Sequence, residues 1–323
     1  MSSEIPAGPA PGTVASTDAG AGTDTVAGTV AGTVAILGRP NVGKSTLLNR
    51  IVGEKLAIVS PKPQTTRNRI VGVWNGAGGQ IVFVDTPGVH AGKKGLGRFM
   101  QGEALGTIAD VDAVLLVVDV YQEGPGDAER KILSELRAAD KRAVLAINKV
   151  DKAKDKTTLL PLLTAWQPLF PFAALVPISA TGGTNVAGVV TELCRLLPAR
   201  PPLYGPDMLT DRTERFLAAE LVREQLFLKL RQELPYAVAV KIDSWEERPR
   251  GDVVIAATIL VERESQKAIV VGKGGAMIRE VGTAARGEIT DRLGRPAHLK
   301  LEVRVAPDWT TSPEILEELG YRP

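Results

Sequence analysis

The chain has 323 residues, of which 44% are hydrophobic and 24% charged, and its formal net charge is +2. That length suits about two domains, and the composition is that of a folded globular protein. No apolar run reaches the roughly 18–20 residues that cross a bilayer, which excludes an integral membrane protein. Cys194 is the one cysteine, so an internal disulfide framework and a cysteine-bound zinc site are excluded, and we expect a cytoplasmic protein.

The first 30 residues are rich in Ala, Gly, Thr and Pro and contain three acidic residues. They lack the basic start and the continuous apolar stretch of a secretory signal. A segment with such small side chains buries too little apolar surface to offset the entropy of folding. We therefore predict that residues 1–30 form a disordered tail.

Four apolar runs with the character of buried strands follow this tail. The runs cover residues 33–37, 81–85, 113–119 and 143–147, and residues 127–139 place apolar side chains at helical spacing. Strands that alternate with helices predict a mostly parallel sheet with right-handed crossovers. We assign residues 31–200 to this α/β domain.

A proline-rich stretch ends the first domain. Residues 198–206 contain four prolines, and we take residues 201–209 as a linker. Beyond it the pattern indicates a helix capped at Thr210 or Asp211, two strands, further helices and a last strand. These features predict a small α+β domain at residues 210–308 and a C-terminal tail at residues 309–323.

A glycine-rich motif lies between the first apolar run and a helical segment, where a P-loop is expected. Backbone N–H groups and the helix start can hold a β-phosphate there. Lys44 can reach the β- and γ-phosphate oxygens, and the Ser45 hydroxyl is an expected Mg²⁺ ligand. The residues that fit G-x-x-x-x-G-K-[ST] are Gly38, Arg39, Pro40, Asn41, Val42, Gly43, Lys44 and Ser45.

A second motif selects the base. The run at residues 143–147 is followed by Asn148, Lys149, Val150 and Asp151, at a strand end where nucleotides bind. The Asp151 carboxylate can accept hydrogen bonds from N1–H and the 2-amino group of guanine, whereas adenine would leave it unpaired. Asn148 would brace the loop, the Lys149 stem would cover the base, and a backbone N–H of Ser179 or Ala180 could meet guanine O6.

Two further segments would complete a metal and γ-phosphate site. Asp85, Thr86, Pro87 and Gly88 close the run at residues 81–85, and we expect Asp85 to hold Mg²⁺ through water and the Gly88 N–H to sense the γ-phosphate. Residues 64–67 offer Thr65 or Thr66 as a second hydroxyl ligand, and we prefer Thr66. We therefore name Ser45, Thr66 and Asp85 as metal residues, and Lys44 and Thr66 as catalytic residues.

These five motifs resemble those of the TrmE–Era branch of translation-factor-related GTPases. The resemblance covers residues 33–200 and implies the family fold and GTP hydrolysis. Val89 follows Asp85–Gly88 at the position where Ras-like GTPases carry a water-orienting glutamine. Valine has no donor or acceptor, so we expect Val89 to line the nucleotide loop as an apolar residue without a catalytic role.

A second glycine loop occurs in the C-terminal domain. Gly272, Lys273, Gly274 and Gly275 form a G-x-x-G sequence between apolar segments. KH modules use such a loop to clamp a nucleic-acid backbone. Residues 248–304 contain eleven Lys or Arg and seven Asp or Glu, which suits phosphate contacts. The element order resembles a type II KH fold, and we name the four loop residues as RNA-binding.

The two domains together resemble Era-type GTPases over about 290 residues. The resemblance implies binding to 16S rRNA near its 3′ end and a role in assembly and maturation of the small (30S) ribosomal subunit. It also implies peripheral association with the cytoplasmic face of the membrane. We further expect a monomer and no DNA partner. The alternative is a signalling GTPase whose C-terminal domain docks a protein or membrane.

Overall fold

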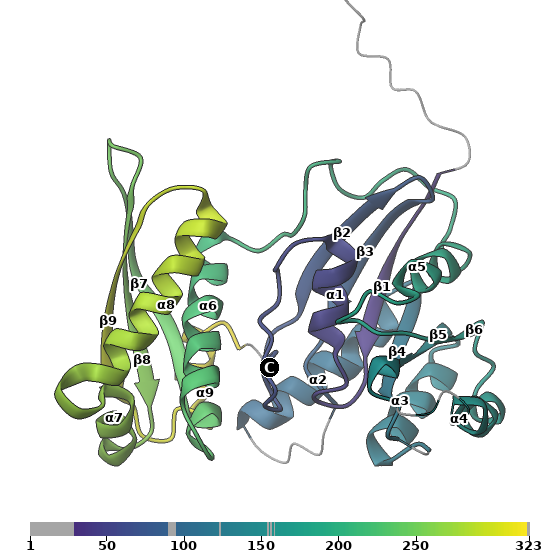
Figure 1. Cartoon of the computed structure of the whole chain (residues 1–323), viewed down its shortest axis with the longest axis horizontal. Helices are drawn as coiled ribbons and strands as arrows, with labels where there is room; N and C mark the ends of the chain where they lie inside the picture. The colour runs from purple at the N-terminus through teal and green to yellow at the C-terminus, as the bar shows by residue number, and fades with distance from the viewer. Residues whose placement is uncertain are drawn as a thin grey trace, which may run out of the picture.

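The computed structural model describes residues 29–89, 95–122, 124–153, 155, 157 and 159–321. The polypeptide forms two lobes, each with its own sheet, and Figure 1 shows them side by side. Residues 1–28 of the predicted tail lie outside the described part. Val30, which we counted with that tail, opens the first strand.

The N-terminal lobe contains a six-stranded sheet in the order β2-β3-β1-β4-β5-β6. All neighbouring strands are parallel except β2 and β3, which form an antiparallel pair. The predicted α/β class with a mostly parallel sheet is therefore confirmed. The strands are β1 (Val30–Leu37), β2 (Ile70–Gly76), β3 (Gly79–Asp85), β4 (Ala113–Asp119), β5 (Arg142–Asn148) and β6 (Ala174–Pro177).

Helices cover both faces of this sheet, as strands that are apolar on both sides require. The helices α1 (Lys44–Val52) and α5 (Val186–Cys194) pack on the face that carries Val34 and Ile36 of β1. The opposite face carries Ala35 and Leu37 and is covered by the three other helices. These are α2 (Gly95–Asp110), α3 (Asp127–Ala138) and α4 (Leu159–Trp166).

The C-terminal lobe has a three-stranded sheet in the order β7-β8-β9, in which β7 is antiparallel to β8 and β9 is parallel to β8. Its helices lie together on one face of this sheet and share an apolar core with it (Figure 1). This is the predicted small α+β domain. Its elements are α6 (Glu214–Lys229), β7 (Ala239–Glu247), β8 (Val253–Val261), α7 (Glu264–Val271), α8 (Ala276–Leu293) and β9 (Ala297–Val305).

The linker lies along the first sheet. The side-chain oxygen of Gln80 accepts hydrogen bonds from the N–H groups of Leu203 and Tyr204, at 2.6 and 2.9 Å. The carbonyl of Leu209 accepts from the N–H of Val73 in β2. Because this stretch is held extended against the sheet, α6 begins later than predicted, and its cap is Thr213.

The C-terminal segment is folded, so the prediction of a tail at residues 309–323 is wrong for the described residues 309–321. A short helix, α9 (Pro313–Glu318), lies in this segment. Trp309, Leu316 and Tyr321 are buried against Leu96, Phe99 and Met100 of α2 and against Leu260 of β8. The segment therefore packs between the two lobes. No helix among the described residues is long and apolar enough to cross a membrane.

Candidate functional site

The P-loop joins β1 to α1 in a conformation that glycine permits. Gly38 has φ +146°, and a Cβ atom there would lie 2.2 Å from the carbonyl oxygen of Val117. Gly43 has φ +100°, and a Cβ atom would lie 2.3 Å from the side-chain nitrogen of Asn148. Both positions therefore exclude larger residues. The N-terminus of α1 follows directly and faces the loop, as anion binding requires.

Lys44 is buried at the base of this loop. Its Nζ donates to the carbonyl oxygens of Gly38 and Arg39, at 3.2 and 3.0 Å. Burial lowers the pKa of Lys44 to about 8, and the nearby Asp85 carboxylate partly opposes that shift. Carbonyl partners can be exchanged for phosphate oxygens, which are stronger acceptors for an ammonium group.

Three oxygen-bearing side chains from separate segments meet beside the loop. The hydroxyl of Ser45 lies 2.8 Å from the hydroxyl of Thr66 and donates to Asp85 Oδ2 at 2.7 Å. Thr66 also donates to that oxygen, at 3.4 Å. Thr65 instead bonds Ser60 and the carbonyl of Lys62. The geometry therefore favours Thr66 over Thr65 as the second hydroxyl.

These oxygens suit Mg²⁺, which prefers hard ligands and retains water. Asp85 Oδ1 is buried and has no hydrogen-bond partner among the described residues, so an acceptor stands unused there. Burial raises the pKa of Asp85 to about 6, while Lys44 and the two hydroxyls act in the opposite direction. A divalent cation would offset the cost of this buried carboxylate.

The loop that follows Asp85 contacts the P-loop. Thr86 donates its hydroxyl to the carbonyl of Ile36 at 2.8 Å, and a Cβ atom on Gly88 would lie 2.6 Å from the nitrogen of Pro40. The N–H of Val89 donates to the carbonyl of Gly38 at 3.1 Å. We counted Val89 among the GTP-binding residues, but its side chain is buried in the apolar cluster on the sheet face that carries Ala35 and Leu37. Any GTP-binding role of Val89 would therefore rest on its backbone.

Asn148 connects the base-recognition loops to the P-loop. Its Nδ2 donates to the carbonyl of Val42 at 2.8 Å, and its Oδ1 accepts from the N–H groups of Lys149 and Ala180. The Ala180 N–H is thus directed at Asn148 in this structure, and its expected contact with guanine O6 stays a prediction. Asp151 lies on the short turn Val150–Lys152 and is exposed, with its carboxylate available to a base.

Two ion pairs near this site were not predicted from the sequence. Lys149 has φ +69°, and its Nζ donates to the carbonyl of Asn41 at 2.6 Å and lies 3.3 Å from Asp119 Oδ2. Arg39 pairs with the buried Glu129 of α3 at 2.8 Å. Asp119 ends the apolar run of β4, and that position at a strand end was a signal that could have identified it.

The second glycine loop connects α7 to α8. Gly272 has φ +74° and ψ +169°, a region open to glycine alone, and a Cβ atom there would lie 2.7 Å from that of Met277. Gly274 and Gly275 are left-handed with no close neighbour, and Lys273 is exposed. The loop therefore presents flat backbone and one cation to solvent, which suits a phosphate chain.

The fold and these two sites define a P-loop nucleotide-binding protein with guanine-specific loops and an appended KH domain. Two family models match the chain, described as "50S ribosome-binding GTPase" over residues 33–149 and "KH domain" over residues 233–310. The chain is 50% identical to GTPase Era of Geobacter metallireducens over 291 residues, covering 90% of this chain and 97% of that protein. It is 47% identical to GTPase Era of Lacticaseibacillus paracasei, with 90% and 96% covered.

Solved structures agree with these matches. A variant of Era from Aquifex aeolicus bound to GDP and AlF₄⁻ has a TM-score of 0.88 and 39% identity, covering 91% of this chain and all of that one. The same values hold for Era in complex with MgGDPNP and nucleotides 1506–1542 of 16S ribosomal RNA. The chain belongs to the Era family of GTPases, and its enzymatic class is GTP hydrolysis.

Proposed function

We propose that this protein is a GTP-hydrolysing switch that binds 16S rRNA near its 3′ end and assists assembly of the small ribosomal subunit. The observation that carries this proposal is its likeness, at 39% identity over 91% of the chain, to an Era structure that holds both MgGDPNP and that RNA segment. The P-loop lies within the part of the chain that matches the GTPase family model, and the G-x-x-G loop lies within the part that matches the KH model.

In the nucleotide site, Ser45 and Thr66 would bind Mg²⁺ directly and Asp85 would bind it through water. Magnesium would neutralise charge on the β- and γ-phosphates. Lys44 would exchange its carbonyl partners for phosphate oxygens, and the P-loop N–H groups would hold the β-phosphate. Asp151 would select guanine, braced by Asn148 and Lys149. In this arrangement catalysis depends on positioning and electrostatics, with no covalent intermediate on the protein.

In the second domain, the four loop residues Gly272, Lys273, Gly274 and Gly275 would clamp an RNA backbone. The proposed location is the cytoplasm, where ribosomal subunits are assembled, with peripheral attachment to the membrane. The proposed state is a monomer, and its proposed partner is the small subunit precursor. Sedimentation of a lysate, followed by detection of the protein in small-subunit, free and membrane fractions, tests these assignments together.

Photocrosslinking to an RNA oligonucleotide with the sequence of the 16S 3′ end tests the RNA assignment. The informative variants are Gly274→Asp and Gly275→Asp, because both positions are left-handed, which aspartate tolerates. A Cβ atom at Gly274 would have no neighbour within 4 Å, and one at Gly275 would lie 3.9 Å from a side-chain nitrogen of Arg279. The added carboxylate should repel phosphate and abolish crosslinking. Gly294→Asp is the matched control, since Gly294 is also left-handed and open but lies at the far end of α8.

Loss of crosslinking in the loop variants, with retention in Gly294→Asp, would support RNA binding by this loop. Equal crosslinking in all variants would show that the loop is structural. A wild-type protein that binds no RNA but still hydrolyses GTP would favour a signalling GTPase that docks a protein or membrane.

A further inference from the structure

The segment that carries Thr66 lies against the KH domain. The N–H of Val59 donates to Glu224 Oε1 of α6 at 2.8 Å. The Nζ of Lys62 donates to the carbonyls of Phe227 and Leu230, which end that helix. A cation at the C-terminus of a helix is favourably placed, because the unpaired carbonyls there carry partial negative charge. The segment that brings Thr66 to the predicted metal site is therefore in contact with the C-terminal lobe.

Arg67 makes the deepest of these contacts. It follows Thr66 directly in the chain, and its side chain is 1% exposed. One guanidinium nitrogen donates to the carbonyl of Val238 at 2.7 Å, and another donates to those of Tyr236 and Pro235, at 3.0 and 3.3 Å. Three backbone carbonyls from the α6–β7 connection thus form a cradle that fits the planar fork of an arginine.

Aromatic rings complete the cradle. The Arg67 guanidinium carbon lies 5.7 Å from the ring centroids of both Phe227 and Trp309. Trp309 is itself fixed, because its indole N–H donates to the carbonyl of Ala237 at 3.0 Å. Burial lowers the pKa of Arg67, and the nearby Arg223 acts in the same direction, whereas Tyr321 and Glu220 oppose the shift. A buried charge of this kind depends on its partners for stability. Moving the Arg67 side chain out of the cradle would leave an empty space and unpaired carbonyls, so the side chain is held in place.

We propose that Arg67 is a positioning residue through which the KH domain holds Thr66 at the magnesium site. Consecutive Cα atoms are about 3.8 Å apart, so a fixed Arg67 restricts where the Thr66 hydroxyl can lie. The inference rests on the proposed magnesium role of Thr66. Because the contact joins the two sites, the coupling between them is reciprocal. A ligand of the KH domain that shifts this contact changes the magnesium-dependent affinity for GTP, and GTP changes the affinity of the KH domain for that ligand by the same factor.

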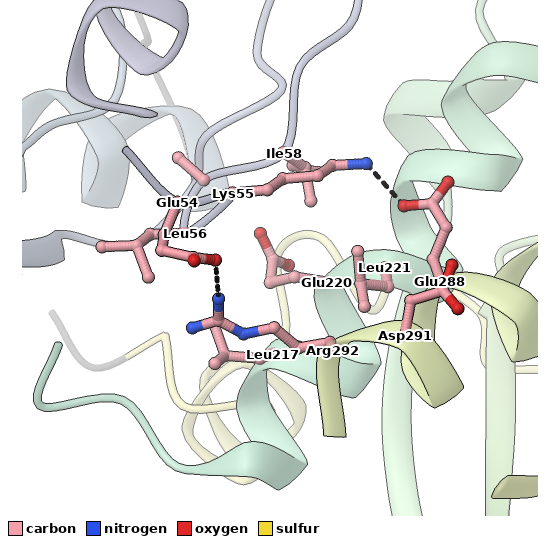
Figure 2. Close-up of a pocket in the computed structure, with 11 residues that line it drawn as sticks. Glu54, Lys55, Leu56, Ile58, Leu217, Glu220, Leu221, Glu288, Asp291 and Arg292 are labelled. Atoms are coloured by element: carbon pink, nitrogen blue, oxygen red, sulfur yellow. Dashed lines mark hydrogen bonds and ion pairs between the residues drawn. The ribbon is translucent and has the colours of Figure 1, made fainter. Parts of the chain in front are cut away.

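Besides the apolar cluster around Trp309, several ion pairs connect the two lobes. Lys55 pairs with Glu224 at 2.5 Å and with Glu288, and Glu54 pairs with Arg292 at 3.0 Å. Figure 2 shows Glu54, Lys55, Glu288 and Arg292 around a cavity of about 270 Å³ between the lobes. The Lys55 side chain is 45% exposed, so water screens its ion pairs and each contributes less to stability than a pair buried on both sides, although Glu224 is itself buried. Lys55 therefore provides a matched control, a cation that crosses the same interface but lies eleven positions from Thr66.

The test compares full-length wild type with Arg67→Ala, Arg67→Lys, Thr66→Ala and Lys55→Ala. The measurement is the Mg²⁺ concentration that gives half-maximal binding of fluorescent GDPNP, and separately of fluorescent GDP. For GDPNP, Arg67→Ala should raise this concentration by about tenfold, toward the value for Thr66→Ala. For GDP it should change little, because GDP has no γ-phosphate to draw Thr66 to the metal. Lys55→Ala should resemble wild type with both nucleotides.

Arg67→Lys provides the rescue comparison, and it remains informative if Arg67→Ala fails to fold. Lysine keeps the charge but cannot reach three carbonyls with a planar fork, so its value should lie between those of wild type and Arg67→Ala. If both Arg67 variants match wild type while Thr66→Ala does not, the positioning role is wrong. If Thr66→Ala also matches wild type, the magnesium role of Thr66 is wrong as well.

A second readout separates coupling from general damage. In wild type, the affinity for GDPNP should differ between samples with and without the 16S 3′-end oligonucleotide. In Arg67→Ala, the two affinities should be nearly equal. RNA affinity in the presence of GDP should stay near wild type, which shows an intact KH domain. An RNA effect on GDPNP binding that persists undiminished in Arg67→Ala would overturn the proposal.

Discussion

The hydroxyl oxygens of Ser45 and Thr66 lie 2.8 Å apart, although 21 positions separate these residues in the chain. Ser45 stands on α1, which is packed into the core of the first lobe, whereas Thr66 belongs to a segment docked on the second lobe. The Ser45 hydroxyl is therefore held in place by the first lobe, and the Thr66 hydroxyl by contacts with the second. That difference leads to distinct expectations for the two side chains.

Ser45→Ala should weaken Mg²⁺-dependent binding of both GDP and GDPNP, by about tenfold or more, because it removes a ligand held rigidly on α1. Thr66→Ala should affect GDPNP alone. Equilibrium titration with fluorescent nucleotides at saturating and at limiting Mg²⁺ measures both effects. If Ser45→Ala spared GDP binding, Ser45 would not be a metal ligand in the GDP state.

Binding of Mg²⁺ should weaken in mild acid. The pKa of Asp85 is raised to about 6, so its carboxyl becomes protonated as the pH falls below that value. Metal competes with this proton, and the apparent affinity for Mg²⁺ should fall about tenfold per pH unit below 6. The stability of the nucleotide-free protein should instead increase as the pH falls through this range. A folded-state pKa above the ordinary 3.8 means that the cost of burying the charge is present above pH 6 and is relieved as the pH falls toward 4.

Asp85→Asn is the control for this pH dependence, since asparagine carries no charge at any pH. The nucleotide-free variant should unfold at a higher temperature than wild type at pH 7, and the difference should shrink between pH 6 and 4. Its magnesium-dependent nucleotide binding should be weak throughout that range. Thermal unfolding without nucleotide and titration with Mg²⁺ measure the two behaviours, and a constant difference in melting temperature would contradict the assignment.

The base specificity should change with Asp151→Asn. The amide replaces a double acceptor and can donate to the 2-oxo group of xanthine, so preference should move from GTP toward XTP, with a loss of GTP affinity on the order of 10²-fold. Competition binding with GTP, XTP and ATP measures the change. Unaltered GTP affinity would remove Asp151 from the base site.

Val89→Ala should leave the basal hydrolysis rate within about an order of magnitude, because the Val89 side chain packs in the core and offers no group to the attacking water. Removing buried methyl groups should lower the free energy of unfolding by about 1–3 kcal/mol. Lys44→Ala should abolish turnover in the same assay. A single-turnover rate that collapses in Val89→Ala, with folding intact, would reveal a role in positioning water.

The contact between α2 and the C-terminal segment should depend on Gly95. This residue has φ +48°, and a Cβ atom there would lie 2.2 Å from the carbonyl oxygen of Thr310, which accepts from the N–H of Leu96. Gly95→Ala should therefore destabilise the protein by about 1–3 kcal/mol. Gly102→Ala, in the open interior of the same helix, should stabilise it by about 0.5–1 kcal/mol. Chemical denaturation measures both, and equal effects would contradict the steric account.

The nucleotide loops and the KH loop could be predicted from the sequence because each is a short run of residues whose chemistry depends on its neighbours in the chain. The P-loop, the Asn148–Asp151 motif and the G-x-x-G loop all follow apolar or helical segments that local periodicity identifies. Parallel strands then bring their carboxyl ends to one edge of a sheet, so the convergence of Ser45 and Asp85 was also predictable.

The sequence did not indicate the start of α6 or the packing of residues 309–321. The α6 cap is Thr213 because the linker backbone is already engaged by Val73 and Gln80. Trp309 and Tyr321 are buried against residues of α2 that lie more than 200 positions earlier in the chain. Burial of this kind has no local period, since each side chain meets its partners only after both lobes have formed.

Arg67 shows most clearly what only the tertiary structure decided. In the sequence it is a charged residue in a polar segment, and such residues are mostly exposed. In the folded protein it is buried: its two terminal nitrogens donate to three carbonyls from another lobe and two rings pack against the guanidinium, while Nε has no hydrogen-bond partner among the described residues. Local chemistry predicted where GTP and RNA would be recognised. The link between the two sites depends on contacts 160 or more positions apart, which only the packing of the lobes creates.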